Sequence, residues 1–512
     1  MSDRVAQAWG LLPEYLAWHV LLSASALALG LLISLPLAVA ASRSVRLRWP
    51  VLAFAGLIQT IPSLALLALF YPLLLALSAL SQTVFGQGFS ALGFLPSLLA
   101  LTLYSMLPIL RTGTAGILGV DPAVREAADG VGMTPRQRLF QVELPLAMPV
   151  IMAGVRTAAV WTIGAATLST PVGQTSLGNY IFAGLQTENW VFVLFGCAAS
   201  AALAMVVDQL LGLIETGAAR RKRGLMIAGA ALLVVGVLAA LTPQAAFGKP
   251  SSYVVGAKNF SEQYILAEVM AERLERSGGH VSRKEDLGSA VAYRALAAGE
   301  LDVYVDYSGT LWTNVLKRRD NPGRAQVLAQ LTTELKKRDG VVVLGSLGFE
   351  NAYAFAMRAD RAKALGIASL ADLARQAPRL TLGSDLEFLS RPEWKAVDAA
   401  YGFNFKKERS FQPTFMYRAL SGGEADVISA FSSDGRISAD KLVVLTDPKG
   451  ALPPYDAVIL ISPKRAGDER LLAALRPLIG SISVEAMRAA NYSVDRDQGK
   501  ASPAEAARAL HP

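Results

Sequence analysis

The sequence predicts a polytopic α-helical membrane domain of about six spans, followed by a two-lobed α/β domain. Two observations predict this division. Long apolar runs with short basic breaks fill the chain up to Ala245, and from Tyr253 onward short β-rich runs alternate with helical ones. Of the 512 residues, 53% are hydrophobic and 18% are charged, which is too apolar for a soluble protein.

The membrane spans are predicted from apolar runs long enough to cross about 30 Å of hydrocarbon. Basic residues at 43–48 follow the first run and the basic cluster 220–223 precedes the last, which places both in the cytoplasm and the N-terminus outside. Pro62 and Pro72 are expected to kink the second span. The predicted spans are 15–41, 51–80, 95–110, 151–168, 191–214 and 225–241.

Two charged residues fall inside these spans. Arg156 lies one turn into the fourth, where it either snorkels to the cytoplasmic surface or lines a pore. Asp208, near the inner end of the fifth, either pairs with a neighbouring arginine or faces water. Neither alternative is settled by the sequence for Asp208, whereas snorkelling is the preferred interpretation for Arg156.

The sixth span has a basic flank, an apolar run and then the stretch 242–246, a pattern typical of a secretory signal placed in mid-chain. Everything beyond Ser251 is therefore expected to be exported, and cleavage after Ala246 is left open. The predicted domains are a transmembrane domain at 1–220, an anchoring span and linker at 221–250, and an extracytoplasmic substrate-binding domain at 251–512.

Composition also excludes several classes of function. The single Cys197 lies in an apolar run, and the histidines His19, His280 and His511 have no ligand spacing, so we expect no disulfide framework and no metal site. No phosphate-loop motif occurs, so the chain is not expected to hydrolyse ATP itself. We expect no catalytic residues and no cofactor. The net charge of +8 comes largely from clusters beside the spans, which predicts contact with lipid rather than nucleic acid.

The segment 121–145 is the most polar part of the membrane half and must connect two spans. The run from Glu126 is predicted to open a short helix, Gly132 to end it, and Pro135 to lie near the first turn of a second short helix. This segment resembles the EAA loop of ABC importer permeases, which implies docking on a separate ATPase subunit in the cytoplasm. An ordinary amphipathic loop helix is the alternative. The matching residues are Glu126, Ala127, Ala128, Gly132, Leu144 and Pro145.

An internal repeat divides the exported half into two related lobes. The segments 293–303 and 417–427 share a helix, a turn and a buried strand at the same spacing. We place one lobe at 252–353 and 456–512 and the other at 354–455. In open α/β sheets ligands bind beyond the carboxyl ends of strands, so two such lobes facing each other make a cleft.

The residues that follow these strands are aromatic. Tyr307 and Phe431 occupy matching positions in the repeat, and Tyr353 and Tyr455 lie near strands that are expected to cross between the lobes. A cage of π-faces attracts a quaternary ammonium, and a basic or hydroxyl group at the other end holds a carboxylate. The pattern therefore predicts a site for a zwitterion, with the polar end supplied by Lys258, Thr310 and Arg391.

Two of these assignments have alternatives. Arg391 is either a ligand contact or a surface ion-pair former with Glu387 or Glu393. Trp312 either lines the cleft or caps the core. Tyr293 and Tyr417 match each other in the repeat, but on helices, where packing is the expected role.

The segments 255–264, 306–310, 387–392 and 453–455 are similar to the binding proteins of glycine betaine/carnitine/choline importers. The resemblance implies a type II periplasmic-binding-protein fold fused to an ABC importer permease. By motif the cage maps to Tyr307, Tyr353, Phe431 and Tyr455. Phe431 departs from the tyrosine usual in the family, which keeps another betaine, ergothioneine, as an alternative ligand.

The resemblance implies an importer subunit in the cytoplasmic membrane of a bacterium, with the binding domain on the outer side. Two copies of the chain are expected to pair, and a separate ATPase to drive the cycle. The rival class is a membrane-tethered receptor that binds the ligand without transport. An enzyme is the third option, and no Ser/His/Asp or paired-carboxylate arrangement in the sequence supports it.

Overall fold

The computed structural model describes residues 2–86, 88–187, 189–247, 252–318, 320–411, 413–496 and 498–510. The chain forms two compact units. The first comprises Met1–Gly184 and Trp190–Lys249, and the second comprises Leu185–Asn189 and Pro250–Pro512. Each unit is described by itself below.

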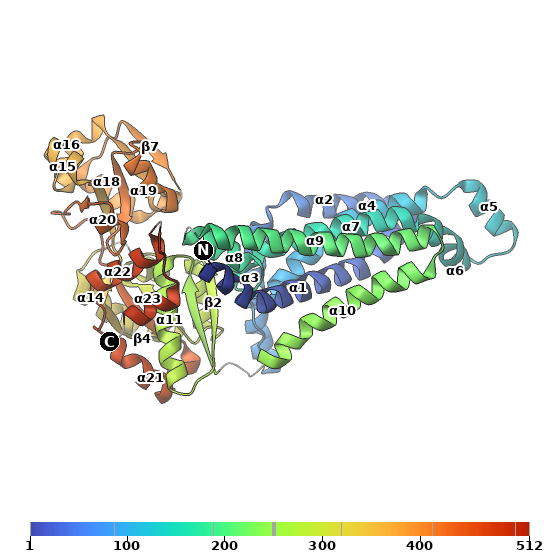
Figure 1. Cartoon of the computed structure of the whole chain (residues 1–512), viewed down its shortest axis with the longest axis horizontal. Coiled ribbons are helices and arrows are strands. Elements are labelled where there is room, and N and C mark those ends of the chain that lie inside the picture. The colour runs from blue at the N-terminus through green and yellow to red at the C-terminus, as the bar shows by residue number, and fades with distance from the viewer. Residues whose placement is uncertain are drawn as a thin grey trace. The chain divides into compact units, whose positions relative to one another are not determined.

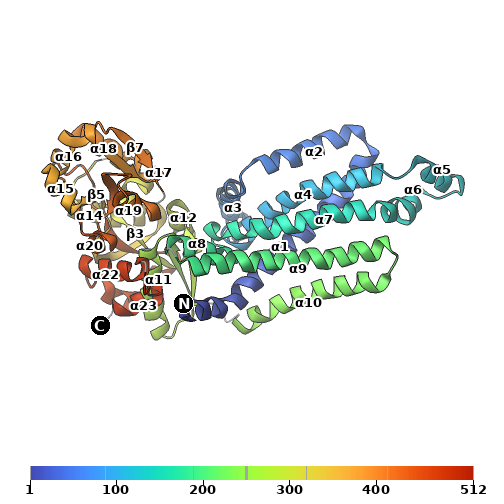
Figure 2. The same ribbon diagram turned by 45° about the horizontal axis from the view of Figure 1, so that its top comes forward.

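The first unit is an α-helical bundle in which α1 packs on α4, α4 on α7, α7 on α9 and α9 on α10. Figures 1 and 2 show these helices side by side, with α5 and α6 together at one end of the bundle. The helices are α1 (Ser2–Arg43), α2 (Val45–Thr60), α3 (Ser63–Phe85), α4 (Phe94–Leu118), α5 (Pro122–Gly130), α6 (Pro135–Arg138), α7 (Leu144–Ala166), α8 (Gly178–Gln186), α9 (Trp190–Ala219) and α10 (Arg223–Phe247).

Six helical stretches of the described residues are long and apolar enough to cross a membrane. This agrees with the predicted class of a polytopic membrane domain. The predicted linker that ends at residue 250 lies outside the described residues from residue 248 onward. The six stretches are Arg4–Arg43, Ser63–Phe85, Phe94–Leu118, Pro135–Val172, Trp190–Ala219 and Arg223–Thr242.

The second span differs from its prediction. A single kinked span was expected over 51–80, but the chain forms two helices there, α2 and α3. Ile61 is extended, with ψ of 126°, and Pro62 precedes the first residue of α3. Pro62 has no N–H to donate and sterically disfavours a helical conformation at Ile61, so it breaks the helix rather than bending it. Pro72 lies inside α3.

Arg156 and Asp208 pair with each other. The Arg156 guanidinium on α7 donates to the Asp208 carboxylate on α9 through Nε (2.8 Å) and Nη2 (2.6 Å). Its Nη1 donates at 2.8 Å to Glu215, which lies two turns beyond Asp208 on α9. The two helices are thus joined by one arginine between two acids, which answers the question left open for Asp208.

The predicted coupling loop is confirmed as helical, with corrected bounds. Asp121 caps α5 by accepting from the Ala123 N–H at 2.9 Å, so the helix starts at Pro122 and Glu126 lies in its middle rather than at its opening. Its end agrees with the prediction. Gly132 has φ of +79°, and its N–H and that of Met133 donate to the carbonyls of Asp129 and Ala128. This is a Schellman end, which requires a left-handed residue.

The helix beginning at Pro135 is not short, contrary to the prediction. Thr134 and Gln137 form a capping box at its start, and α6 then continues through the π turn η1 (Leu139–Glu143) into α7. Pro145 cannot donate to the carbonyl four residues earlier. In the π turn the Leu144 N–H instead bonds the Leu139 carbonyl five residues back, which accommodates the proline without ending the helix.

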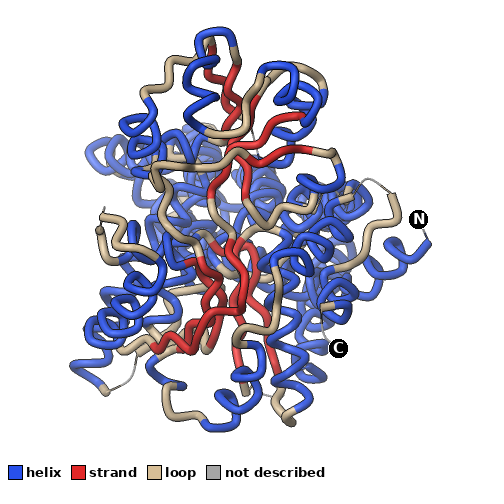
Figure 3. Tube along the Cα trace, turned by 90° about the vertical axis from the view of Figure 1, so that its left-hand side faces the viewer, coloured by secondary structure: helices blue, strands red, loops and turns tan. Residues whose placement is uncertain are grey.

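The second unit contains two five-stranded sheets, shown in red in Figure 3. The first has the order β2-β1-β3-β10-β4 and the second β7-β6-β8-β5-β9. In both, three parallel strands are followed by an antiparallel one, so β3 and β8 occupy matching places, as the sequence repeat predicts. The strands are β1 (Tyr253–Lys258), β2 (Val281–Leu287), β3 (Val303–Tyr307), β4 (Val342–Glu350), β5 (Tyr353–Arg358), β6 (Thr381–Ser384), β7 (Lys407–Ser410), β8 (Val427–Phe431), β9 (Leu442–Val444) and β10 (Asp456–Ile461).

The chain passes between the two sheets twice. It leaves the first sheet after β4 and enters the second at β5, and it returns from β9 to β10. Short crossing segments of this kind are where two lobes hinge about a ligand. The helices that surround the sheets are α11 (Ser261–Arg276), α12 (Ser289–Ala297), α13 (Ser308–Thr310), α14 (Arg324–Asp339), α15 (Ala359–Leu365), α16 (Leu370–Gln376), α17 (Leu386–Ser390), α18 (Pro392–Tyr401), α19 (Pro413–Ser421), α20 (Arg436–Ala439), α21 (Glu469–Leu475), α22 (Val484–Asp495) and α23 (Pro503–Ala509).

Candidate ligand-binding site

Three of the four predicted cage rings lie together where the chain crosses between the sheets. Tyr353, the first residue of β5, is the backbone partner of Phe431, the last residue of β8, and their ring centroids are 4.9 Å apart. Tyr455, just before β10, meets Tyr353 edge-on at 5.6 Å. Phe388 packs on the other side of Tyr353 at 4.7 Å. The aromatic cluster therefore draws on both crossing segments.

Tyr455 has its place because of a glycine after β3. A Cβ atom on Gly309 would lie 2.6 Å from the Tyr455 ring, so any larger residue there would displace the ring. The neighbouring Ser308 hydroxyl donates to the Pro454 carbonyl at 3.0 Å and accepts from the Asp456 N–H at 2.9 Å. These contacts fix the segment before β10 against the end of β3.

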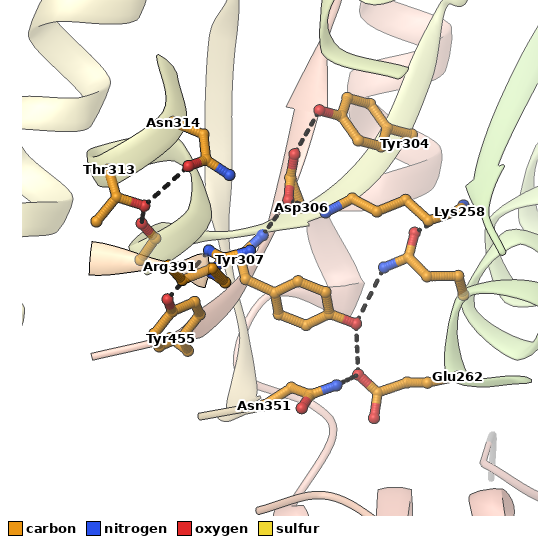
Figure 4. A network of polar contacts seen from close by, with 12 residues as sticks. Lys258, Glu262, Tyr304, Asp306, Tyr307, Thr313, Asn314, Asn351, Arg391 and Tyr455 are labelled. Carbon is orange, nitrogen blue, oxygen red and sulfur yellow. Dashed lines mark hydrogen bonds and ion pairs between the residues drawn. The ribbon is translucent and has the colours of Figure 1, made fainter. Parts of the chain in front are cut away.

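Tyr307, the fourth predicted ring, belongs to a polar network rather than to the aromatic cluster. Its ring stacks near Phe260, with 6.1 Å between centroids. Its hydroxyl donates to Glu262 Oε1 at 2.6 Å and accepts from Gln263 Nε2 at 3.0 Å. Figure 4 shows this network, in which the Asn351 amide donates to the same Glu262 oxygen at 3.0 Å.

Both predicted cations already have carboxylate partners. Lys258 Nζ pairs with Asp306, and both side chains are buried. The Asp306 carboxylate also accepts from the Tyr304 hydroxyl at 2.6 Å. The Lys258 ammonium lies 5.1 Å from the centroid of the Tyr307 ring, and Figure 4 shows the two side by side.

Arg391 makes the second ion pair. Its Nε and Nη2 donate to the two oxygens of Glu393 at 3.1 and 2.9 Å, and its guanidinium lies 5.3 Å from the Tyr353 ring centroid. Glu393 also accepts from the Tyr455 hydroxyl. Arg391 is 7% exposed, so the ion pair with Glu393, which was one of the two alternatives for this residue, lies buried beside the aromatic cluster rather than at the surface. The third predicted polar residue, Thr310, is buried in α13.

Burial sets the protonation of this region. It raises the pKa of the Tyr307 and Tyr455 phenols well above the ordinary value, so both rings are neutral. It also raises the pKa of Glu262, although hydrogen bonds from Tyr307, Asn491 and Asn351 act in the opposite direction. For Glu393 burial acts to raise the pKa, but the hydrogen bond and charge of Arg391 lower it overall.

Trp312 caps the core. Its indole is 1% exposed, donates to the Asp320 carbonyl at 2.7 Å and is covered by the Arg318 guanidinium at 4.1 Å from the ring centroid. Tyr293 also packs, with its hydroxyl donating to Asp339 at 2.6 Å. Among the described residues, no three His, Cys, Asp or Glu side chains gather closely enough to hold a metal ion.

Sequence patterns did not indicate Glu262 as a site residue, or the side chains that donate hydrogen bonds to its carboxylate. Glu262 and Gln263 lie inside the segment 255–264 that carries the family resemblance, but only Lys258 was singled out there. Asn491, on α22, donates to Glu262 Oε2 at 2.8 Å and to the Ser433 carbonyl at 2.9 Å. It lies 229 residues from Glu262, so no local pattern indicates the contact.

Comparison with protein families agrees with both halves. The family described as the substrate binding domain of ABC-type glycine betaine transport system matches residues 251–510. The family described as the binding-protein-dependent transport system inner membrane component matches residues 30–220. The chain belongs to these families. It is a fusion of an ABC transporter permease with a substrate-binding domain of the glycine betaine type, and a multi-pass membrane protein.

Individual relatives cover either most of the chain or a part of one half. The ergothioneine transport permease/ergothioneine binding protein EgtU of Helicobacter pylori is 29% identical over 462 residues, covering 87% of this chain and 80% of the relative. The choline transport system permease protein OpuBB of Bacillus subtilis is 40% identical over 197 residues, covering 38% of this chain and 83% of the relative. A crystal structure of a glycine betaine/carnitine/choline ABC transporter is 29% identical, covers 50% of this chain and 96% of that one, and has a TM-score of 0.46.

Proposed function

We propose that this chain imports a small quaternary-ammonium compound, such as glycine betaine, choline or carnitine. The observation that carries the proposal is the aromatic cluster of Tyr353, Phe431 and Tyr455 at the segments that cross between the two sheets. Neutral π-faces attract a methylated nitrogen that has no N–H to donate. Their position at the crossings means that hinge closure and ligand binding act on the same residues.

The ligand contacts that we propose are Tyr307, Tyr353, Phe431 and Tyr455 for the ammonium group, and Lys258, Thr310 and Arg391 for the polar end. The ion pairs set a condition on this polar end. A ligand carboxylate must share Arg391 with Glu393 or Lys258 with Asp306, whereas a ligand without a carboxylate leaves both pairs intact. Comparing glycine betaine with choline therefore tests how the polar end is used.

Ergothioneine is the second candidate ligand. Two considerations favour it. A relative that matches both halves of the chain is named for ergothioneine transport, and the family resemblance places Phe431 where a tyrosine is usual. A phenyl ring keeps the π-face of tyrosine but lacks its hydroxyl. This side of the binding site is therefore less polar and leaves more room for a bulkier ligand.

The arrangement in the cell follows from the same proposal. The chain lies in the cytoplasmic membrane of a bacterium, in contact with lipid, with residues 251–512 on the outer side and 221–250 as anchor and linker. Within that outer domain, one lobe comprises 252–353 and 456–512 and the other 354–455. A separate cytoplasmic ATPase docks on 121–145 of the permease domain 1–220, and two copies of the chain form one pathway. The docking residues are Glu126, Ala127, Ala128, Gly132, Leu144 and Pro145.

Titration calorimetry of the full chain in lipid nanodiscs tests the ligand class, with glycine betaine, choline, carnitine and ergothioneine as probes. We expect at least one to bind, and the substitution Y353A to weaken its binding by about 100-fold, or about 2.7 kcal/mol, because the central ring of the cluster is lost. The matched control is Y492A, which removes an exposed tyrosine of α22. Absence of binding by all four probes to the unmodified chain contradicts the proposal.

Uptake separates the importer from the receptor. With a partner ATPase in proteoliposomes, an importer accumulates the bound ligand in an ATP-dependent manner. A receptor binds the same ligand with no accumulation, and that result would leave the ligand class intact while removing the transport claim.

A further inference from the structure

One buried carboxylate in the membrane unit is surrounded by three guanidinium groups. Glu143, the last residue of the π turn η1, is 0% exposed. Arg43 donates to both of its oxygens, with Nη1 at 3.2 Å from Oε1. Arg138 Nε lies 3.3 Å and Arg125 Nε 3.7 Å from the same Oε1 atom. Glu143 lies outside the spans predicted from the apolar runs and is not one of the proposed docking residues.

The local sequence explains why this side chain faces inward. Pro145 imposes the π turn described above, and a π turn holds one more residue than an α turn. Glu143 is the last residue of that turn and is buried, whereas Gln141, two residues earlier and so on the opposite side of the helix, is exposed. Single π turns inside α-helices frequently occur at functional sites.

The three arginines belong to three different helices, and one of them, Arg125, also contacts α4. Arg43 is the last residue of α1, Arg125 belongs to α5 and Arg138 ends α6. The Arg125 Nη2 atom also donates to the Leu118 carbonyl, at 3.1 Å, and to the Ile117 carbonyl at the C-terminal end of α4. Cations are favoured at that end of a helix. Glu143 is therefore a common partner for the last residue of α1, for α5 and for α6, while Arg125 alone reaches the end of α4.

This cluster carries one excess positive charge even with Glu143 present. Three arginines face two acids, because Asp129 of α5 also accepts from Arg138, with 2.6 Å between Nη1 and Oδ1. Asp129 is half exposed, whereas Glu143 is fully enclosed. Removing the Glu143 charge leaves three neighbouring cations with one solvent-exposed partner. The α5 helix, whose Glu126 and Ala127 are exposed, cannot shift relative to α1 without breaking a contact to Glu143.

We propose that Glu143 is the positioning residue that transmits movement of α5 to α1, in parallel with the direct contact of Arg125 with the end of α4. The inference rests on the proposed docking of the ATPase on 121–145. When the ATPase moves α5, Arg125 moves with it and pulls on the carboxylate shared with Arg43, so the inner ends of the spans follow. Glu143 touches neither the transported ligand nor the ATPase.

The test uses the full chain with its partner ATPase in proteoliposomes, with the tightest-binding of choline, glycine betaine, carnitine and ergothioneine as the transported probe. For E143Q, which keeps the shape and removes the charge, we expect unchanged probe affinity and at least about a tenfold lower ratio of probe transported to ATP hydrolysed, or about 1.4 kcal/mol. The matched control is E215Q, which weakens the pairing of α7 and α9 through Arg156 away from the coupling loop. Its ratio should stay within about twofold of the unmodified chain.

A double variant separates transmission from simple stabilisation. R43Q/E143Q removes one cation together with the acid, so the like-charge repulsion is relieved and thermal stability should return toward that of the unmodified chain. If Glu143 transmits movement, the transport ratio stays low. Recovery of the ratio in R43Q/E143Q, or an unchanged ratio in E143Q alone, overturns the inference.

Failure of the proposed function gives a different result. In that case the unmodified chain shows no ATP-dependent uptake, and the inference falls with the function on which it rests. If the unmodified chain transports the probe and E143Q has the same ratio of probe transported to ATP hydrolysed, only the role assigned to Glu143 is refuted.

Discussion

The two halves of this chain bury carboxylates in different ways. In the membrane half, Glu143 is enclosed by three guanidinium groups. In the binding half, Glu262 is equally buried, but its hydrogen bonds come from a phenol and from the amides of Asn351 and Asn491, none of which carries a charge. The charge of Glu143 is balanced by guanidinium cations, whereas Glu262 has only neutral hydrogen-bond donors around it among the described residues.

This difference has an energetic consequence. A buried charge without a counter-ion pays the cost of leaving water, and neutral donors recover only part of it. Burial accordingly raises the pKa of Glu262. Asp286, next to the end of β2, is the stronger case, because burial raises its pKa to about 7. Its Oδ1 atom accepts from the Tyr264 hydroxyl, and its buried Oδ2 atom has no hydrogen-bond partner in the part of the chain that the structure describes. The binding half should therefore respond to pH through acids of this kind.

The largest expected effect comes from Asp286. Burial raises its pKa in the folded state from the ordinary 3.8 to about 7, so the folded state binds the proton more tightly than the unfolded state. The protonated carboxyl therefore contributes its full stabilisation below about pH 4, and this contribution is lost as the pH rises through about 7. This rise in the pKa corresponds to roughly 4 kcal/mol in the free energy of unfolding. D286N should remove this pH dependence and stabilise the binding half at pH 8. Hydrogen exchange of β1 and β2 amides in the full chain, at pH 4.5 and 8, measures it.

The control for Asp286 is an aspartate in the opposite situation. Asp360 is exposed, and its hydrogen bond from Arg358 lowers its pKa. D360N should change the exchange of the same amides little at either pH. If the D286N variant keeps the pH dependence of the unmodified chain, the uncompensated carboxylate is not its source.

A smaller effect is expected from Glu262, which sharpens the comparison at the binding site. E262Q replaces an acceptor oxygen with an NH₂ group that faces donors from Tyr307, Asn351 or Asn491, so one buried donor loses its acceptor. We expect about tenfold weaker ligand binding, near 1.4 kcal/mol, because the Tyr307 ring is no longer held. Calorimetry of the full chain in nanodiscs measures this.

The matched control for Glu262 lies on the same helix. Glu268 of α11 pairs with Arg283 at 2.9 Å near the surface. E268Q should leave ligand affinity within about twofold, since this half-buried ion pair involves none of the proposed ligand contacts. Equal losses in E262Q and E268Q would show that α11 as a whole, rather than the Glu262 carboxylate, sets the affinity.

The smallest effect concerns segment 121–145 of the membrane half, the proposed coupling loop. Gly132 has φ of +79°, a conformation that costs an alanine about 1 kcal/mol or slightly more. G132A should raise the hydrogen-exchange rate of the last α5 amides about five- to tenfold. G130A is the control, because Gly130 is the last helical residue of α5 and an added Cβ meets nothing within 4 Å. Equal exchange in the two variants would contradict the assigned helix end.

Much of the fold follows from local pattern. The long apolar runs predicted a polytopic membrane half, and the repeat at 293–303 and 417–427 predicted two related lobes, which agrees with the matching places of β3 and β8. The helix end at Gly132 was predicted from a glycine in the expected place. Proline was the weaker guide. Pro62 broke a span that was expected to kink, and Pro145 was absorbed by a π turn inside a helix that was expected to be short.

The candidate site was predictable in part. Tyr353, Phe431 and Tyr455 were selected from the repeat and the crossing segments, and the structure brings them together. Tyr307 was selected on the same grounds but stacks near Phe260 instead. Lys258 and Arg391 were identified as cations, while their pairing with Asp306 and Glu393 depends on how the strands and helices meet.

The sequence by itself determined the class of each half, the order of the spans and the aromatic residues beyond the strands. These depend on apolar periodicity and turn chemistry, which act over a few residues. Only the tertiary structure decided which partner satisfies each buried charge. Arg43 and Glu143 are 100 residues apart, and Glu262 and Asn491 are 229 apart. A buried charge must find a partner somewhere, but its own neighbourhood in the chain does not say where, because packing of distant elements supplies it.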